Sequence, residues 1–167
     1  MDTPSIELVT AAGPGDLDRA RALFREYADG LGVDLCFQGF AAELASLPGE
    51  YAAPRGALLL ALVNGAAAGC CALRPRETPD HPNACEMKRF YVRRAFRGWG
   101  LGRRLAEAVL DRARQAGYAC ILLDTLEEMQ TARSLYGELG FREVPPYYQN
   151  PIAGTHYLKA NLSPNFK

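Results

Sequence analysis

The sequence predicts a mixed α/β fold, with a central, mixed and mostly antiparallel sheet of about six to seven strands flanked by about four helices. Two observations support this prediction. An Asn64-Gly65 pair separates two apolar runs, which is typical of an antiparallel hairpin. Later in the chain, a strand, a glycine-rich loop, a long helix and a second buried strand follow one another over residues 85–126, as in a β-α-β crossover.

The first half of the chain combines a weakly alternating stretch, two helical stretches and the hairpin. The predicted elements are a strand at 5–12, a helix that starts at Asp16 and ends near Gly30, a short helix at 40–47, and hairpin strands at 57–63 and 66–73. Asp16 is the predicted cap of the first helix. The segment 33–39 between the helices contains Phe37 and Gln38, and we take it as a candidate wall of a substrate pocket.

The second half contains the crossover, a further helix and two last strands. Its predicted elements are a loop at 74–83, a strand at 86–92, a helix from 101 to about 117, a strand at 119–126, a helix over 129–139, and strands at 141–144 and 155–162. Strand alternation places four residues on one face of the sheet: Glu86, Lys88, Phe90 and Val92. No repeat or linker divides the 167 residues, so we expect a single domain over 1–167.

The loop before the long helix has the composition of an anion-binding site. Residues 97–103 (RGWGLGR) hold three glycines on alternate positions, which let a ligand approach the backbone closely. The start of a helix presents unpaired N–H groups and the positive end of the helix dipole. Arginines in and beside the loop add positive charge. The pattern therefore predicts a site for a phosphate or pyrophosphate.

Composition disfavours several other classes of partner. The chain has 19 basic and 19 acidic residues, so its net charge favours neither nucleic acid nor a membrane, although seven basic residues cluster between Lys88 and Arg104. The longest apolar run, Ala57–Val63, is too short to cross a bilayer. Five cysteines without C-x-x-C spacing and two histidines give no metal-site pattern. With no signal-peptide pattern, a reduced, cytoplasmic setting is expected.

Two motifs in the second half resemble those of the GNAT acetyltransferase superfamily. RGWGLG after FYV matches its Arg/Gln-x-x-Gly-x-Gly/Ala loop, and 132–141 match its Ala-x-x-Leu-Tyr-x-x-x-Gly-Phe helix. The resemblance is to a small stand-alone bacterial-type member and covers nearly the whole chain. It implies the GNAT fold, acetyl-CoA (coenzyme A) as cofactor, and compatibility with a homodimer. Where Met129 stands, many members carry an asparagine that contacts the cofactor arm.

Carried over to this sequence, the resemblance implies a set of cofactor-binding residues around the loop. These are Phe90, Tyr91, Val92, Arg97, Gly98, Trp99, Gly100, Leu101, Gly102 and Arg103. Tyr91 and Val92 would offer backbone groups to the pantetheine arm and the thioester oxygen, and the amides after Arg97 would hold the pyrophosphate.

Acetyl transfer to an amine needs a proton donor for the leaving thiolate and a base for the amine. Tyr136, on the apolar stripe of its helix and in the second motif, is the predicted donor. Glu86 is the predicted base, directly or through water, with a surface position or an ion pair with an arginine such as Arg89 as the alternative. Asp124 is a weaker candidate, with a structural hydrogen bond as its alternative.

Aromatic residues in the late proline-rich loop are candidates for the acceptor side. Tyr147 and Tyr148 are predicted to cover the acceptor amine, with simple packing as the alternative. His81 and His156 are interpreted as surface or hydrogen-bonded histidines rather than catalysts.

The predicted function is transfer of an acetyl group from acetyl-CoA to a primary amine of a small molecule, by direct attack in a ternary complex. A non-catalytic acyl-CoA-binding or sensor protein would keep the same loop and is the main alternative. A dinucleotide-dependent oxidoreductase is disfavoured, because the loop reads G-x-G-x-G and lies five residues beyond its strand.

Overall fold

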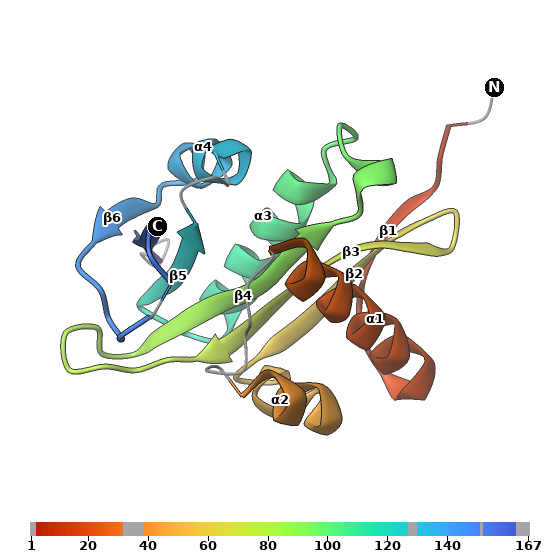
Figure 1. Ribbon diagram of the computed structural model, residues 1–167. Helices are drawn as coiled ribbons and strands as arrows, with labels where there is room; N and C mark the ends of the chain where they lie inside the picture. The colour runs from red at the N-terminus through yellow and green to blue at the C-terminus, as the bar shows by residue number, and fades with distance from the viewer. Residues whose placement is uncertain (1–2, 32–38, 127–129, 151, 163–167) are drawn as a thin grey trace.

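The computed structural model describes residues 3–31, 39–126, 130–150 and 152–162 (Figure 1). The predictions for Phe37, Gln38 and Met129 lie outside these described residues. In chain order the elements are β1 (Ile6–Thr10), α1 (Gly13–Leu31), α2 (Phe40–Ser46), η2 (Gly49–Tyr51), β2 (Ala57–Val63), β3 (Ala66–Pro75), β4 (Ala84–Val92), η3 (Arg94–Phe96), α3 (Leu101–Gln115), β5 (Cys120–Leu126), α4 (Gln130–Glu138), β6 (Arg142–Val144) and β7 (Thr155–Asn161).

The strands of the described chain form one seven-stranded sheet in the order β1-β2-β3-β4-β5-β7-β6. Every neighbouring pair is antiparallel except β4 and β5, which are parallel. The predicted mixed, mostly antiparallel sheet is therefore confirmed. The hairpin is confirmed as well, because Asn64 and Gly65 have φ angles of 51° and 83° and join paired residues Val63 and Ala66.

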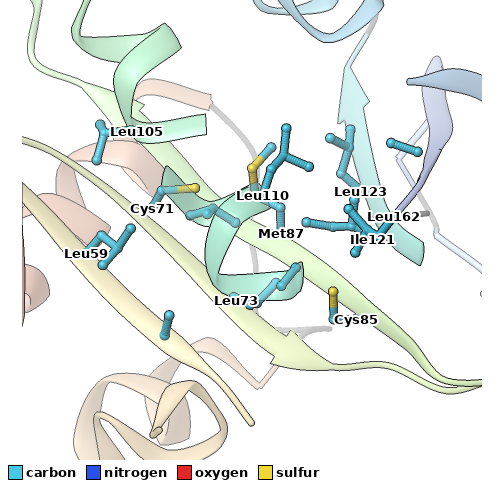
Figure 2. Packing of buried hydrophobic residues seen from close by; sticks show 14 of the residues in the cluster. Leu59, Cys71, Leu73, Cys85, Met87, Leu105, Leu110, Ile121, Leu123 and Leu162 are labelled. Carbon is cyan, nitrogen blue, oxygen red and sulfur yellow. The ribbon is translucent and has the colours of Figure 1, made fainter. Parts of the chain in front are cut away.

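Helices cover both faces of the sheet, α1 and α2 one face and α3 the other (Figure 1). The strand β2 (ALLLALV) is consequently buried along almost its whole length. The larger core lies between the sheet and α3, and Figure 2 shows Leu59, Leu73 and Ile121 from three strands meeting Leu105 and Leu110 of the helix. Within the described residues, no helix is long and apolar enough to cross a membrane.

Two predicted boundaries differ from the structure. The helix α1 begins at Gly13 rather than Asp16. Pro14 is tolerated in the first turn because the N–H groups there have no acceptor within the helix, so the missing N–H of proline costs no hydrogen bond. Asp16 still satisfies the helix start, since its carboxylate accepts the Ala12 N–H at 3.1 Å. The strand β3 continues beyond the predicted end at residue 73, because Arg74 pairs with Glu86 in the β3–β4 ladder.

The predicted alternation along β4 is wrong beyond Lys88. Ala72 of β3 pairs with Lys88, whereas Cys70 pairs with Tyr91, so two residues of β4 stand opposite one residue of β3. Arg89 has a φ of 58°, which marks a β-bulge at this point. The extra residue reverses which face each side chain occupies. Glu86 and Lys88 therefore lie on the α1–α2 face, whereas Phe90 and Val92 pack into the core on the α3 face.

Candidate active site

The sheet opens between β4 and β5. These strands pair only over Ala84–Glu86 and Cys120–Leu122 and then separate (Figure 1). A small cavity lies at the opening, and its lining includes Tyr27 of α1 and Tyr136 of α4. Because Tyr27 lies on the α1 face and Tyr136 packs into the core on the α3 face, the cavity reaches both faces of the sheet.

The N-terminus of α3 offers a row of unoccupied backbone donors. Gly100 is the N-cap, with a φ of 78°, and no side chain bonds to the first turn. In the described structure, the Arg104 N–H is the first of this segment to donate to a backbone carbonyl, that of Gly100 at 3.2 Å. The N–H groups of residues 98–103 therefore have no backbone acceptor. A Cβ added at Gly98 or Gly100 would meet nothing within 4 Å, so a ligand can reach these amides. The residues present therefore fit the pyrophosphate of the predicted cofactor.

Side chains beside this loop fix its shape and charge. Arg97 donates through Nε to the Val92 carbonyl at 2.8 Å, which ties the loop to the end of β4. Arg103 forms ion pairs with Glu107 and with Glu138 of α4. Trp99 is 45% exposed and is the one large apolar side chain of the described residues that faces solvent, at the outer rim of the loop. Leu101 is buried and anchors the first turn.

The end of β4 presents backbone groups to the opening. The Arg93 amide donates to Ala68 of β3 at 2.8 Å. Because backbone groups alternate along a strand, the N–H and carbonyl of Val92 point to the opposite edge, from which β5 has separated. The bond between the Val92 carbonyl and Arg97 agrees with this direction. The Val92 N–H is therefore positioned to bind an oxygen in the opening.

Tyr136 reaches the opening from α4. Its ring lies between Phe90, at a centroid distance of 5.9 Å, and Phe141, at 5.5 Å, and only 5% of the residue is exposed. Burial raises the pKa of the Tyr136 phenol well above 10. Its hydroxyl makes no hydrogen bond to any other described residue, although the side chain lines the cavity. The structure thus holds a protonated and uncommitted donor at the opening.

Glu86 lies on the other face of the sheet, in a closed set of partners. The residue has no exposed surface, and its Oε1 accepts from Arg74 Nε at 2.9 Å. Its Oε2 accepts from the Tyr147 hydroxyl at 2.5 Å. Arg74 also bonds Glu50 at 2.9 Å. The arginine that pairs with Glu86 is thus Arg74 of β3, rather than the Arg89 named in the alternative reading.

Asp124 of β5 forms a second polar group beside Glu86. Its Oδ2 accepts from the hydroxyl of Tyr148 and from Asn150 Nδ2, the latter at 3.2 Å. Lys88 Nζ lies 3.7 Å from Oδ1. Burial would raise the pKa of Asp124, but the Lys88 ammonium and the Tyr148 hydroxyl outweigh burial and hold it below its ordinary value. The structural hydrogen bond proposed as the alternative for Asp124 is therefore present.

The bulge residue Arg89 connects β4 to α2. Its guanidinium donates to both carboxylate oxygens of Glu43, at 2.8 and 2.7 Å, and stacks over the Phe40 ring at 5.2 Å. Only 3% of Arg89 is exposed. This bidentate pair holds α2 against the edge of the cavity.

The structure brings together most of the described residues predicted for catalysis and for the acceptor. Tyr147 and Tyr148 both donate hydrogen bonds to carboxylates of the sheet, Tyr147 to Glu86 and Tyr148 to Asp124. Sequence reasoning missed Arg74 and Asn150, which complete the two groups, and assigned no role to Lys88. Only the β3–β4 register reveals that position 74 faces position 86.

Neither histidine lines the cavity. His156 Nδ1 lies 2.7 Å from Glu143 Oε2 on the β6–β7 edge. His81 sets its ring edge-on to Tyr147, at a centroid distance of 6.5 Å. The position of His156 agrees with a hydrogen-bonded histidine, whereas the ring Nδ1 of His81 is buried without a hydrogen-bond partner in the described structure.

Comparison with known proteins agrees with this site. Residues 20–141 match the family model described as the acetyltransferase (GNAT) family. An uncharacterised N-acetyltransferase of Schizosaccharomyces pombe is 37% identical over 98% of this chain and 99% of its own length. A GNAT-family acetyltransferase of Staphylococcus aureus shares the fold, with a TM-score of 0.77 at 18% identity over 95% of this chain and 100% of the other. The protein yncA of Salmonella typhimurium, solved with its cofactor acetyl-CoA, has a TM-score of 0.68 at 20% identity over 96% and 95% of the two chains. On this evidence, the chain belongs to the GNAT family of acetyltransferases.

Proposed function

We propose that this enzyme transfers the acetyl group of acetyl-CoA to a primary amine of a small molecule, and that the amine attacks directly within a ternary complex. The observation that carries the proposal is the cavity between β4 and β5, which Tyr136 lines from one face and the Lys88–Asp124 pair from the other.

Membership of the GNAT family makes the protein an N-acetyltransferase that uses acetyl-CoA. When bound, acetyl-CoA supplies an activated acetyl thioester. The free amides of 98–103 would bind its pyrophosphate, with Arg97 and Arg103 adding positive charge beside them. The open edge of β4 at Phe90–Val92 would bind the arm between pyrophosphate and thioester.

The Val92 N–H is the proposed donor to the carbonyl oxygen that gains charge during transfer. It belongs to a strand held in place by β3, and it points toward the edge of β4 from which β5 has separated. A fixed donor of this kind needs no reorganisation as charge develops, and this arrangement is among the larger contributions to acyl-transfer catalysis.

Tyr136 is the proposed acid for the leaving thiolate. Three observations support the role: the side chain lines the cavity, its hydroxyl is uncommitted among the described residues, and burial keeps the phenol protonated by raising its pKa well above 10. A group with these properties can donate a proton at neutral pH without first losing another partner.

Glu86 is the proposed base for the amine. Its carboxylate has no exposed surface, and the Tyr147 hydroxyl donates to its Oε2. The proposed proton path therefore runs from the amine through the Tyr147 hydroxyl, or a water that replaces it, to Oε2. Asp124, whose pKa is held below its ordinary value by Lys88 and Tyr148 against the effect of burial, is poorly suited to act as a base.

Direct attack is supported by the state of the cysteines. Cys70, Cys71, Cys85 and Cys120 are all buried, and burial raises the pKa of each thiol. A nucleophilic cysteine requires the thiolate, so these four are poorly suited to form an acetylated intermediate.

The test is to incubate the protein with acetyl-CoA and a panel of small primary amines, and to measure release of free coenzyme A thiol. Release above the hydrolysis background, with the acetylated amine identified by mass spectrometry, supports the proposal. Initial velocities that give intersecting lines support a ternary complex, whereas parallel lines indicate a covalent intermediate. Binding of acetyl-CoA by calorimetry without release from any amine would favour the sensor alternative.

A further inference from the structure

Lys88 carries a buried ammonium group with incomplete hydrogen bonding. Its side chain is 5% exposed, and its Nζ lies 3.7 Å from Asp124 Oδ1 and 4.0 Å from Glu86 Oε2. Both distances exceed the length of an N⁺–H···O⁻ hydrogen bond. Two neighbouring arginines differ in this respect, because Arg74 and Arg89 hold their carboxylates at 2.7–2.9 Å. An ammonium has three N–H donors, and across the described residues none of those of Lys88 is used.

The two carboxylates nearest to Lys88 are satisfied without it. Glu86 accepts from Arg74 and Tyr147, and Asp124 accepts from Tyr148 and Asn150. Lys88 is therefore the under-coordinated ion of the cluster. Burying a charged group without hydrogen bonds is costly, and a ligand that supplies an acceptor removes much of that cost.

Lys88 lines the same cavity as Tyr136 and Asp124. A molecule whose amine lies near Tyr136 would therefore bring its neighbouring atoms close to the ammonium. A carboxylate suits the position better than a phosphate, because a dianion would also face the negative charges of Asp124 and Glu86. An acceptor that carries one amine and one carboxylate adds no net charge to the cavity.

We infer that Lys88 binds the carboxylate of the acceptor, so that the substrates of this enzyme are amino acids or related amines that carry a carboxylate near the amine. The inference rests on the proposed function, since it assigns a chemical class to the acceptor of that reaction. Lys88 is thus a specificity-determining residue rather than an acid or base.

The first experiment compares matched acceptors that differ only in charge. A panel of α-, β- and γ-amino acids and their carboxamides is assayed by thiol release with the wild-type enzyme. The acids are expected to have a kcat/KM at least ~10-fold above that of their amides, as the loss of one charge-assisted hydrogen bond predicts. Lys88→Met should lower the ratio of kcat/KM for the acids to that for the amides by ~10-fold or more, and Lys88→Arg should restore part of the preference. Lys159→Met, on β7 and outside the cavity lining, is the matched control and should change neither class.

A second readout does not depend on a substituted protein that folds. The sequence contains three lysines, so selective labelling of lysine side chains gives three NMR signals, at 88, 159 and 167. Adding an amino acid to the enzyme–coenzyme A complex should shift the Lys88 signal alone, and adding its amide should not. If the wild-type enzyme acetylates amides as well as acids, or if Lys88→Met weakens both classes equally, the inference is wrong while the proposed function stands. If no amine of either class yields thiol, the proposed function fails and takes this inference with it.

Discussion

The hydroxyl of Tyr147 donates a 2.5 Å hydrogen bond to Oε2 of Glu86, across 61 positions of sequence. The bond fastens the segment between β6 and β7 onto β4, beside the place where β4 and β5 separate. Arg74 holds the other oxygen of the same carboxylate. A carboxylate with no exposed surface depends on partners of this kind, since a buried charge left without them is strongly destabilising.

Tyr147→Phe removes one of these partners and keeps the ring. The free energy of unfolding is expected to fall by about 1–3 kcal/mol, because Oε2 stays buried without its donor. Acetyl transfer should also slow, since the proposed proton path to Glu86 passes through this hydroxyl. Urea unfolding and thiol release measure the two effects.

Tyr118→Phe is the matched control for this substitution. The Tyr118 hydroxyl donates to the Arg55 carbonyl at 2.6 Å, whereas that of Tyr147 donates to the proposed base Glu86. Its loss should reduce stability by a similar amount and leave kcat unchanged. Equal loss of activity in both variants would show that Tyr147 acts only through stability.

Much of the fold could be predicted because its signals are local. The Asn64-Gly65 turn needs two residues that accept positive φ, and the stripe of α3 needs only a helical period. The amides before α3 were predictable for the same reason, since a helix start leaves them unpaired wherever it occurs.

The acceptor side could not be predicted in this way, because it depends on register. The bulge at Arg89 carries none of the usual glycine or asparagine signal, yet it decides that Glu86 and Lys88 share one face while Phe90 takes the other. The Arg74–Glu86 ion pair results from the pairing of β3 with β4, and the spacing of the two residues along the sequence does not predict it.

Tyr136→Phe tests the proposed acid. We expect kcat to fall about 100-fold or more, the usual contribution of a positioned acid, while the affinity for acetyl-CoA stays the same. Because burial raises the pKa of Tyr136 well above 10, the wild-type rate should show no decline from loss of this proton up to pH 10. Thiol release across pH and calorimetry of acetyl-CoA binding check both statements. A variant with wild-type kcat would remove Tyr136 from the chemistry.

Gly100→Ala tests the binding of pyrophosphate at α3. Gly100 has a φ of 78°, so a side chain there costs about 1–2 kcal/mol in backbone strain and adds a methyl group beside the free amides. The KM for acetyl-CoA should rise more than that strain alone explains. Gly65→Ala is the control, because its φ of 83° imposes similar strain in a hairpin on another part of the molecule. If both variants lose equal stability and both keep the wild-type KM, the loop does not bind the cofactor.

Asp124→Asn should make the free energy of unfolding less dependent on pH in the acidic range. Burial would raise the pKa of Asp124, but Lys88 and Tyr148 hold it below the ordinary value of about 3.8, so the ionised form is favoured by folding. The resulting stabilisation is complete above pH 3.8 and is lost as the pH falls through the lower folded value. The variant should therefore be less stable than the wild type by about 1–3 kcal/mol at pH 7, and the gap should close toward pH 2.

Asp111→Asn, which removes an exposed pair with Arg114, should cost less than about 0.5 kcal/mol at every pH. Urea unfolding from pH 7 to pH 2 measures these differences, and a gap for Asp124→Asn that does not change with pH would mean that the substitution acts through packing instead of charge.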